Sequence, residues 1–299
     1  MIIMKRHHPN WSIICCVVIL TVSVIVSGKC LRLIGLELQI RNIISKGINY
    51  DEFRNIRIEK AKLDRIQDYT DKLLRQYDFE GYSYMDEAGY LTFAMLLSDY
   101  DLIDGDVPDV KMFLRGIGRV SQTRAFQELY RYYRAVFSDI KFFPVPYMGK
   151  GANGVTYEDS WYAPRSYGGD RGHEGTDLMA RNNIRGYFPI ISITDGVVEK
   201  MGWLEQGGNR IGIRSESGGY FYYAHMDTYA PELGSGDRVI AGQLLGFMGD
   251  SGYGKEGTKG KFDVHLHLGI YVPSGTTEIS VNPYWILKIL EDSRTELVH

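Results

Sequence analysis

The sequence predicts an α+β protein in which an N-terminal membrane helix and a helical region precede an antiparallel β domain. The first observation is a stretch without a charge at residues 11–28. The second is a charged, helical periodicity between residues 31 and 77, and the third is a series of short β-branched and aromatic runs separated by glycine turns after residue 187. At 299 residues the chain is long enough for about two domains of roughly 150 residues each. We expect a leader, an apolar segment, a helical region and a β domain, at residues 1–10, 11–28, 29–148 and 149–299.

The charge balance and the cysteines exclude several classes of protein. The chain has 34 Lys and Arg against 37 Asp and Glu, a net charge of -3, which excludes a nucleic-acid binder that works by bulk positive charge. The three cysteines, Cys15, Cys16 and Cys30, lie in the first tenth of the chain. A disulfide framework or a thiolate metal site therefore cannot exist beyond residue 30, and only oxygen and imidazole ligands remain for a metal there.

The apolar segment at residues 11–28 predicts a membrane anchor. As a helix it would span ~27 Å, close to the ~30 Å hydrocarbon core of a bilayer. Lys5 and Arg6 precede it in a short leader, which we expect to be cytoplasmic. A buried core helix is the weaker alternative, because the stretch is apolar on all sides and lies at the extreme terminus. We expect a retained, single-pass signal-anchor.

Two features of this segment leave alternatives open. The small residues at 26–28 suit a signal peptidase, so a cleaved signal and a secreted protein are the alternative, while Lys29 beside Cys30 argues against a lipoprotein. Lys29 and Arg32 follow the segment as closely as the basic residues precede it, so local charge does not fix the orientation. An extracytoplasmic β domain is therefore expected from its chemistry alone.

The region after the anchor has the pattern of an amphipathic stalk or a short coiled coil, over residues 31–77. A seven-residue repeat joins Ile56, Leu63, Thr70 and Tyr77. Further helices are expected at about residues 86–97 and 122–137, and the aromatic stripe of the second predicts core packing rather than a ligand site. We find no catalytic motif here, and the expected partner of this region is a second copy of the chain or another envelope protein.

The β domain begins where prolines and glycines follow the last predicted helix. Pro144 and Pro146 forbid a continued helix, and glycines begin at Gly149. Strands are expected at residues 188–193, 197–201, 210–214, 220–225, 238–241 and 263–272. Among the aromatic residues Tyr222, Tyr223, Trp203 and Trp161 are candidates to line a groove for peptide or sugar, although core packing is the more ordinary role.

Four histidines fall inside the predicted β domain, and none falls in the helical region. His265 and His267 are two apart in a predicted strand, so they share one face while the apolar residues between and beside them share the other. His173 and Asp177 are four apart, which places them on one face of a strand or of a helix; Gly175 argues against the helix. The alternatives are a half-exposed strand and a loop that carry these residues by chance.

His225 is the fourth of these histidines and ends the run at residues 220–225. Alternation predicts that it shares a face with Phe221 and Tyr223, where a lone histidine is usually structural. Glu174 follows His173 but is expected to point away from a metal, so we do not assign it as a base. One carboxylate and two imidazoles suffice for a catalytic zinc site with an open position for water. The spacing does not decide which member of the His265 and His267 pair is the ligand.

Five ordered sequence blocks resemble the lysostaphin/LytM-type zinc metallopeptidases. They read G-H-E-G-T-D-L, D-G-V-V, Y-A-H-M, G-D-R-V-I-A-G-Q-L-L-G and H-L-H, at residues 172–178, 195–198, 223–226, 236–246 and 265–267. The resemblance covers about residues 149–290. It implies an antiparallel β fold around one zinc ion per chain and cleavage of peptide cross-links in bacterial peptidoglycan.

The resemblance also implies a role for each site residue. His173, Asp177 and His267 would be the zinc ligands, His265 the catalytic base, and His225 a second catalytic residue that supports the base and the developing oxyanion. The sequence departs from the family at residues 252–264, where a long loop replaces a short turn and Val264 stands in place of the usual proline. This departure bears on the choice of substrate more than on the chemistry.

The expected function is therefore that of a membrane-anchored zinc metalloendopeptidase acting on peptidoglycan stem peptides and cross-bridges outside the cytoplasm. The alternative is a catalytically silent envelope or sporulation scaffold that keeps the peptidase fold. Such relatives usually lose a ligand or a catalytic histidine, and this chain has lost none. A cytosolic zinc hydrolase on a membrane anchor is disfavoured because peptidoglycan lies outside.

Overall fold

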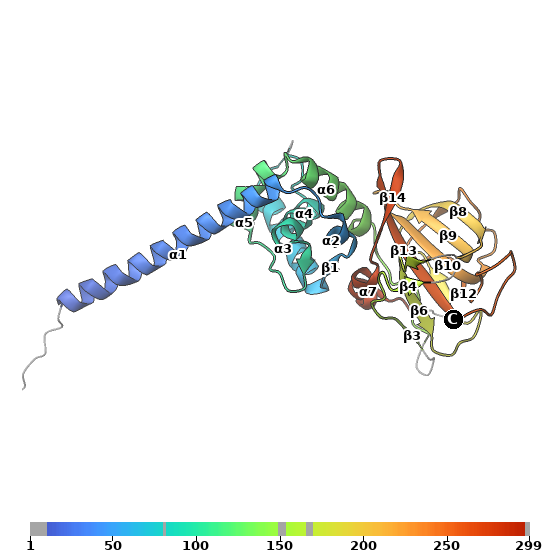
Figure 1. Cartoon of the computed structure of the whole chain (residues 1–299). Helices are drawn as coiled ribbons and strands as arrows, with labels where there is room; N and C mark the ends of the chain where they lie inside the picture. The colour runs from blue at the N-terminus through green and yellow to red at the C-terminus, as the bar shows by residue number, and fades with distance from the viewer. Residues whose placement is uncertain (1–10, 80–81, 149–153, 166–169, 297–299) are drawn as a thin grey trace, which may run out of the picture. The chain divides into compact units, whose positions relative to one another are not determined.

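The computed structural model describes residues 11–79, 82–148, 154–165 and 170–296 (Figure 1). The chain divides into two units, Met1–Gly47 and Ile48–His299. The predicted leader at residues 1–10 and the predicted start of the β domain at residue 149 lie outside the described residues. The expected division into four parts therefore stays a prediction.

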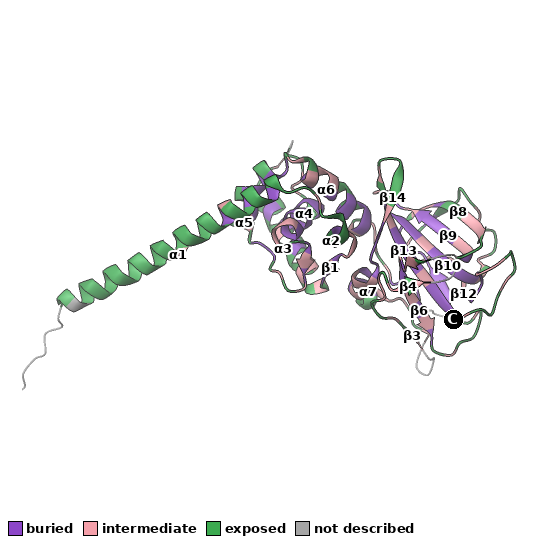
Figure 2. Ribbon diagram, in the orientation of Figure 1, coloured by how far each residue is buried: buried purple, intermediate pink, exposed green. Residues whose placement is uncertain are grey.

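The first unit contains one long helix, α1 (Trp11–Ser45). Its 35 residues would span ~52 Å at 1.5 Å per residue, so the helix runs well beyond the predicted anchor. By length and composition it could cross a membrane over Ile14–Ser45. Its large apolar side chains are mostly exposed up to Ile34, whereas Leu36, Ile40 and Ile43 near its C-terminal end are buried (Figure 2). These properties support a membrane anchor and are equally met by a signal sequence near the N-terminus.

The helical part of the second unit consists of five helices and a two-stranded parallel ladder. These elements are α2 (Tyr50–Arg54), β1 (Arg57–Ile58), α3 (Lys60–Gln76), α4 (Glu87–Leu97), β2 (Asp101–Leu102), α5 (Val110–Val120) and α6 (Arg124–Phe137). Four of the helices begin at a side chain that accepts a backbone N–H, at Asn49, Asp86, Asp109 and Thr123. The predicted helices at residues 86–97 and 122–137 are confirmed, whereas α5 was not foreseen because Gly116 and Gly118 lower its helix propensity.

The helical pattern expected over residues 31–77 is interrupted between residues 46 and 59. Between α1 and α3 the chain forms the short helix α2, which Asn49 caps, and Ile56 lies outside any helix and is fully buried. Helix α3 buries Ile66, Thr70 and Leu73 and packs against α4. The part of the seven-residue repeat that falls in α3 thus corresponds to a buried face of that helix within a compact bundle. The aromatic stripe of α6 is core, as predicted, because Phe126 and Tyr133 are 0% exposed.

The β region forms a ten-stranded sheet, which is antiparallel throughout the described residues. The strands are β3 (Val155–Thr156), β6 (Thr176–Ala180), β7 (Pro189–Ile191), β8 (Gly196–Leu204), β9 (Gly208–Arg214), β10 (Tyr220–Tyr229), β11 (Arg238–Val239), β12 (Leu244–Met248), β13 (His265–Ser274) and β14 (Thr277–Val281). The main order is β11-β8-β9-β10-β13-β6-β3, with β12 paired to β10 and β7 and with β14 paired to β13. A separate hairpin joins β4 (Pro164–Arg165) and β5 (Arg171–Gly172), and the helix α7 (Tyr284–Leu290) and a 3₁₀ turn (Glu291–Ser293) follow the sheet.

This sheet confirms the predicted α+β fold and separates a core face from a site face. Each of the six predicted runs contains a strand. On β13 the side chains of Leu266, Leu268 and Ile270 are 0% exposed and form core, as Figure 2 shows for the middle of the sheet. His265 and His267 alternate with them and so lie on the other face.

Candidate functional site

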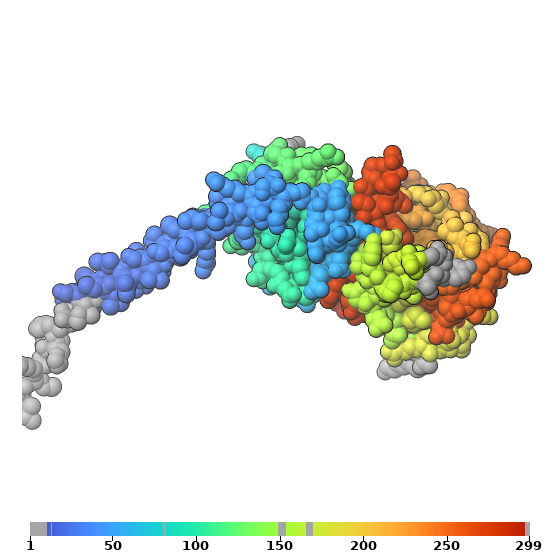
Figure 3. All heavy atoms as spheres, viewed as in Figure 1, coloured from blue at the N-terminus to red at the C-terminus, as the bar shows by residue number. Residues whose placement is uncertain are grey.

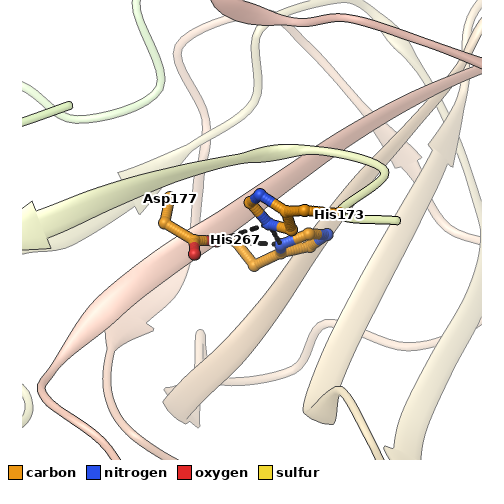
Figure 4. A group of neighbouring side chains, drawn as sticks. All are labelled: His173, Asp177 and His267. Atoms are coloured by element: carbon orange, nitrogen blue, oxygen red, sulfur yellow. Dashed lines mark hydrogen bonds and ion pairs between the residues drawn. The ribbon is translucent and has the colours of Figure 1, made fainter. Parts of the chain in front are cut away.

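His173, Asp177 and His267 converge on one point beside strands β6 and β13 (Figure 4). Nε2 of His173 lies 3.1 Å from Oδ1 of Asp177 and 3.0 Å from Nδ1 of His267. Nδ1 of His267 lies 2.9 Å from the same carboxylate oxygen. The predicted triad is thus brought together, with one donor atom from each side chain facing the other two.

The strand register explains why His267, rather than His265, joins this group. In the antiparallel pair of β6 and β13, His267 lies directly opposite Asp177, whereas His265 lies opposite Met179. Directly opposed residues of a ladder have the closest side chains on a face. Nε2 of His265 is accordingly 3.8 Å from Oδ1 of Asp177. The pairing of β6 with β13 therefore favours His267 over His265 as the third member of the group, a choice that the spacing of the two histidines left open.

Gly175 allows His173 and Asp177 to reach His267 from the same segment. A Cβ atom at residue 175 would lie 2.4 Å from Cε1 and 2.6 Å from Nε2 of His267, well inside contact distance. Any side chain here would push the histidine ring out of place. Gly175, between the predicted ligands His173 and Asp177, is therefore required because the ring of His267 occupies the space of a side chain at this position.

Two further residues hold the group in place, and sequence reasoning missed both. Nδ1 of His173 donates to the carbonyl oxygen of Ser160 at 3.3 Å and lies 3.0 Å from its hydroxyl, which directs Nε2 toward the centre. Nη2 of Arg165 donates to Oδ2 of Asp177 at 2.6 Å, so only Oδ1 faces the two histidines. Both residues precede the sequence blocks, and no spacing rule points to them.

The ionisation of the triad suits a cation. Burial raises the pKa of Asp177, but hydrogen bonds with His173 and His267 outweigh this effect and hold its pKa well below the usual range. Burial lowers the pKa of His267, although the bond to Asp177 opposes the change. The carboxylate is therefore ionised and the imidazole of His267 neutral at pH 7, the states in which both coordinate a metal.

The donor set fits a zinc ion. Imidazole nitrogens and a carboxylate oxygen are common zinc ligands, and two ligands about 2.0 to 2.1 Å from a tetrahedral zinc lie about 3.3 Å apart. The separations of 2.9 to 3.1 Å between the three donor atoms are close to this value. Three protein ligands leave one position open, which is typical of catalytic rather than structural zinc sites.

His265 and His225 both present a proton acceptor beside the triad. Nδ1 of His265 lies 2.7 Å from the carbonyl oxygen of Asp263, and Nδ1 of His225 lies 2.8 Å from that of Ser251. Because a carbonyl only accepts, Nδ1 carries the proton in both rings and Nε2 keeps a lone pair. Burial, and then electrostatic interaction with the neighbouring His265, lower the pKa of His225 well below its usual value, so it is neutral at pH 7.

The predicted face of His225 is wrong, although its place at the site is right. Tyr223 is fully buried in the core, where its hydroxyl oxygen accepts a hydrogen bond from the backbone N–H of Ile193 at 2.9 Å. His225 instead lines the site with Tyr222. Its φ of 62° and an irregularity in the register between Tyr223 and Met226 turn its side chain onto the other face. Such left-handed backbone costs of order 1 kcal/mol and is common at functional sites.

Glu174 turns away from the triad, toward the helical part of the chain. Its Oε1 atom accepts a hydrogen bond from Nη2 of Arg54 at 2.8 Å and from the hydroxyl of Tyr162 at 3.4 Å. It does not share the donor group of the triad. The H-E start of the motif therefore carries an ion pair to α2 rather than a base.

The site lies in a cavity of about 700 Å³. In Figure 3 the segment that contains β4 and β5, in yellow-green, and the loop at residues 252–264, in orange, lie on the same face of the second unit. From that loop the ring of Phe262 lies 4.6 Å from that of His225 and 5.0 Å from that of His265. The loop that departs from the family pattern thus forms part of the wall beside both imidazoles.

Of the four aromatic groove candidates, one lines the cavity. Tyr222 does so, and its ring lies 6.1 Å from that of His267. Tyr223 belongs to the core, Nε1 of Trp203 donates to the carbonyl oxygen of Gly254 at 3.2 Å, and Trp161 lies beside the guanidinium of Arg54. Of the four, only Tyr223 has the core-packing role that was expected for most of them, while Trp161 and Trp203 are half-buried.

Known proteins share both the site segment and much of the remaining chain. The model of peptidase family M23 matches residues 171–283. The L-Ala--D-Glu endopeptidase of Bacillus subtilis is 37% identical over 210 residues, which are 69% of this chain and 61% of that protein. Lysostaphin of Staphylococcus simulans is 30% identical over 130 residues, which are 42% of this chain and 24% of that protein. The chain thus spans about three fifths and about a quarter of these two relatives.

A solved relative extends the likeness into the helical part. The crystal structure of a Ruminococcus gnavus protein designated a glycyl-glycine endopeptidase lytM is 41% identical, covers 87% of this chain and 98% of that chain, and has a TM-score of 0.66. A match of this extent cannot be confined to residues 149–299. All five sequence blocks and the triad fall within the segment that the family model matches. On these grounds the chain belongs to peptidase family M23.

Proposed function

We propose that this chain is a membrane-anchored zinc metalloendopeptidase that hydrolyses peptide cross-links of bacterial peptidoglycan. The observation that carries the proposal is the approach of one donor atom each from His173, Asp177 and His267 to within 4.8 Å of one another. Two more imidazoles with free Nε2 lone pairs stand beside them in the same cavity. Membership of family M23 supports a peptidase acting on peptidoglycan.

The metal would be held by Nε2 of His173, Oδ1 of Asp177 and Nδ1 of His267, one ion per chain. When bound, zinc supplies Lewis acidity that lowers the pKa of a coordinated water to about 7 and polarises a substrate carbonyl. Arg165 and Ser160 keep the Asp177 carboxylate and the His173 ring oriented for this task. His173, Asp177 and His267 all line the cavity, which a peptide could enter.

The protein's own proton transfers fall to His265 and His225. Nε2 of His265 takes the proton of the attacking water and returns it to the leaving amine, since its Nδ1 stays bonded to the Asp263 carbonyl. The ring of His225 lies 4.7 Å from that of His265 and is held by Ser251. In this tautomer His225 accepts rather than donates a hydrogen bond at Nε2. It can therefore support the oxyanion only after it has taken up a proton.

The rival function, a silent envelope or sporulation scaffold, would need none of these features. Retention of all four histidines, each oriented into one cavity, supports the enzyme instead. The relatives carry names for different bonds, L-Ala–D-Glu in one and glycyl-glycine in another. Substrates among stem peptides and cross-bridges are therefore both compatible with the family.

Mass spectrometry of muropeptides tests this function. Purified peptidoglycan is incubated with the detergent-solubilised full chain and zinc, and with the His265→Ala variant as a matched control. We expect new amine and carboxyl termini within the peptide part of the muropeptides, only with the native chain. Unchanged muropeptides over a range of peptidoglycan types would favour the scaffold.

The anchor and the location are part of the same proposal. Helix α1 would hold the protein in the membrane as a single-pass anchor with the β region outside the cytoplasm; cleavage of the segment would give a secreted protein instead. A protease added to intact, wall-stripped cells should remove the C-terminal region. Protection in those cells, followed by digestion after lysis, would contradict this orientation. The expected self-association or envelope partner of the helical region stays a prediction.

A further inference from the structure

Two arginines line the cavity with buried N–H groups that have no partner. Nε of Arg171 and Nη1 of Arg210 are buried and form no hydrogen bond. Both residues line the cavity that holds the triad. Within the part of the chain that the structure describes, neither guanidinium forms a side-chain hydrogen bond or an ion pair. A buried, unsatisfied charged donor is costly, so a cavity that keeps two of them is suited to a ligand that accepts hydrogen bonds.

The acidic residues of the cavity do not accept hydrogen bonds from Arg171 or Arg210, because each of them is paired with a different arginine. Asp177 accepts from Arg165, Glu174 accepts from Arg54, and Glu278 forms an ion pair with Arg214. Arg171 and Arg210 are therefore left as positive charges without a counter-ion among the described residues. The missing acceptor is expected to be an anion.

The position of the two arginines places that anion near the reacting bond. Arg210 is two residues from Gly212 of β9, which lies directly opposite Tyr222 of β10, so Arg210 and Tyr222 share one face of the sheet. The ring of Tyr222 lies 6.1 Å from that of His267. Arg171 precedes the ligand His173 by two residues, and both arginines line the same cavity as Tyr222 and His267, whereas Phe262 of the 252–264 loop lies beside His225.

We propose that Arg171 and Arg210 bind a free carboxylate of the substrate peptide, on a residue next to the scissile amide. This inference rests on the proposed peptidase function and specifies its substrate class. Guanidinium groups match a carboxylate in both charge and planar geometry, and charge-assisted bonds of this kind are the stronger ones. A peptide of glycine alone carries no carboxylate within the chain and would leave both N–H groups unsatisfied. The structure therefore favours an acidic stem peptide over a neutral cross-bridge.

Two synthetic peptides that differ in one group test the inference. One contains a γ-linked glutamyl residue with a free α-carboxylate beside the scissile bond, and the other has a carboxamide at the same atom. Cleavage by the zinc-loaded full chain is measured with both, and binding of both is measured with the His265→Ala variant so that turnover does not interfere. The native chain is expected to prefer the carboxylate by about tenfold or more, chiefly in KM and in Kd.

Arg171→Gln and Arg210→Gln should each reduce this preference toward unity. Gln keeps a polar side chain and removes the charge, and circular dichroism and zinc content show whether each variant has folded. Arg238→Gln is the matched control, because Arg238 is exposed on β11 and does not line the cavity. It should keep the full preference.

The outcomes separate this inference from the function on which it rests. Equal cleavage and equal binding of the two peptides by the native site would overturn the carboxylate site and leave the peptidase function intact. Selective binding of the carboxylate peptide without cleavage would uphold the site and count against the peptidase. Binding of neither peptide, or a preference that both Gln variants retain in full, would also overturn the assignment.

Discussion

The helical part at residues 48–148 and the β part at residues 154–296 bury polar side chains in opposite ways. In the helices, the hydroxyls of Thr70 and Thr92 donate to the carbonyl oxygen four residues earlier in the same helix, at 2.9 and 2.6 Å. In the β part, the buried imidazoles of His173 and His225 reach carbonyls 13 and 26 residues away. A distant partner does not by itself mark a site, since the buried hydroxyl of Tyr90 donates to the carbonyl of Pro108, 18 residues away; the two imidazoles differ in that they line one cavity.

Positive φ values and buried unpaired groups occur in both parts, in the helical part at Tyr84, Asp99, Tyr100 and the hydroxyl of Tyr133, but in the β part several such features gather around one cavity. At the β site a histidine adopts a φ of 62°, three donor atoms crowd one point, and two arginines keep buried N–H groups without partners. Each feature costs stability unless a metal or a substrate relieves it. The helical part instead buries aromatic rings against one another, as Tyr90 stacks on Phe113 at 4.3 Å. Changes in the two parts should therefore have different consequences.

The largest difference is expected between His267→Ala and Thr92→Val. His267→Ala removes one of three zinc ligands, so it should abolish zinc binding and hydrolysis and lower the melting temperature, because the free energy of metal binding is partly folding free energy. Thr92→Val removes one hydroxyl that bonds within its own helix, so it should cost about 0.5 to 1.5 kcal/mol and leave zinc and activity unchanged.

Metal analysis, peptide cleavage and thermal denaturation of both variants check this contrast. A zinc content in His267→Ala equal to that of the native chain would sink the ligand assignment. Loss of zinc in Thr92→Val would show that the two parts are not separable in the way their hydrogen bonds indicate.

The next effect concerns two histidines on the same strand. His265→Ala should lower kcat by about 10²- to 10⁴-fold while zinc stays bound, because in the proposed mechanism Nε2 of His265 transfers protons and does not coordinate the metal. The ratio of zinc to protein and kcat on one peptide are the measurements. If His265→Ala empties the site and His267→Ala keeps it filled, the two roles are reversed; a loss under about tenfold would count against His265 as the base.

Much of the fold and the triad could be predicted from the sequence, because the spacing of residues within one strand or segment determines which side chains share a face. Period-two alternation placed His265 and His267 on one face, and the four-residue spacing joined His173 to Asp177. The choice between the two histidines of β13 depends on its pairing with β6, some 90 residues away in sequence, which no local pattern contains. Strand β6 is not among the predicted runs, and shortness does not explain this, because the strands β7 and β11 within predicted runs are shorter still.

The differences between prediction and structure have related physical causes. His225 was placed on the wrong face because alternation assumes a regular strand, and a positive φ breaks it. The stalk was inferred because a seven-residue repeat fits a buried helix face as well as a coiled coil. Arg54 and Arg165 were missed because their partners lie 120 and 12 residues away and no motif marks either position.

A smaller effect is expected from the arginine that supports the metal ligand. Arg165→Gln should weaken zinc affinity by about 10- to 100-fold, because Oδ2 of Asp177 loses its 2.6 Å bond and the carboxylate is less well oriented. Arg185→Gln is the control, since Arg185 forms a similar bidentate pair with Asp250 away from the triad, at 2.6 and 2.8 Å. Competition with a zinc chelator measures both. Equal affinity in the two variants would mean that Arg165 only holds its hairpin.

The smallest effect should come from the contact between the two parts. Arg54 of α2 donates to the carbonyl and hydroxyl oxygens of Ser280 at 3.0 and 2.7 Å, and to Glu174 at 2.8 Å. Arg54→Ala should cost about 1 to 3 kcal/mol, mostly through the buried Ser280, because the Glu174 carboxylate is 43% exposed and can be hydrated. It should also lower kcat/KM several-fold, since Glu174 adjoins His173.

Arg57→Ala sharpens this last comparison. Arg57 pairs with Asp101 at 2.7 Å wholly within the helical part, so its loss should lower the melting temperature without changing kcat/KM. Thermal denaturation and cleavage of one peptide by both variants distinguish the cases. If both variants lose activity in proportion to stability, the helical part acts only by supporting the fold. A loss of kcat/KM confined to Arg54→Ala, at a temperature where both variants are folded, would assign α2 a direct part in positioning the segment that carries His173.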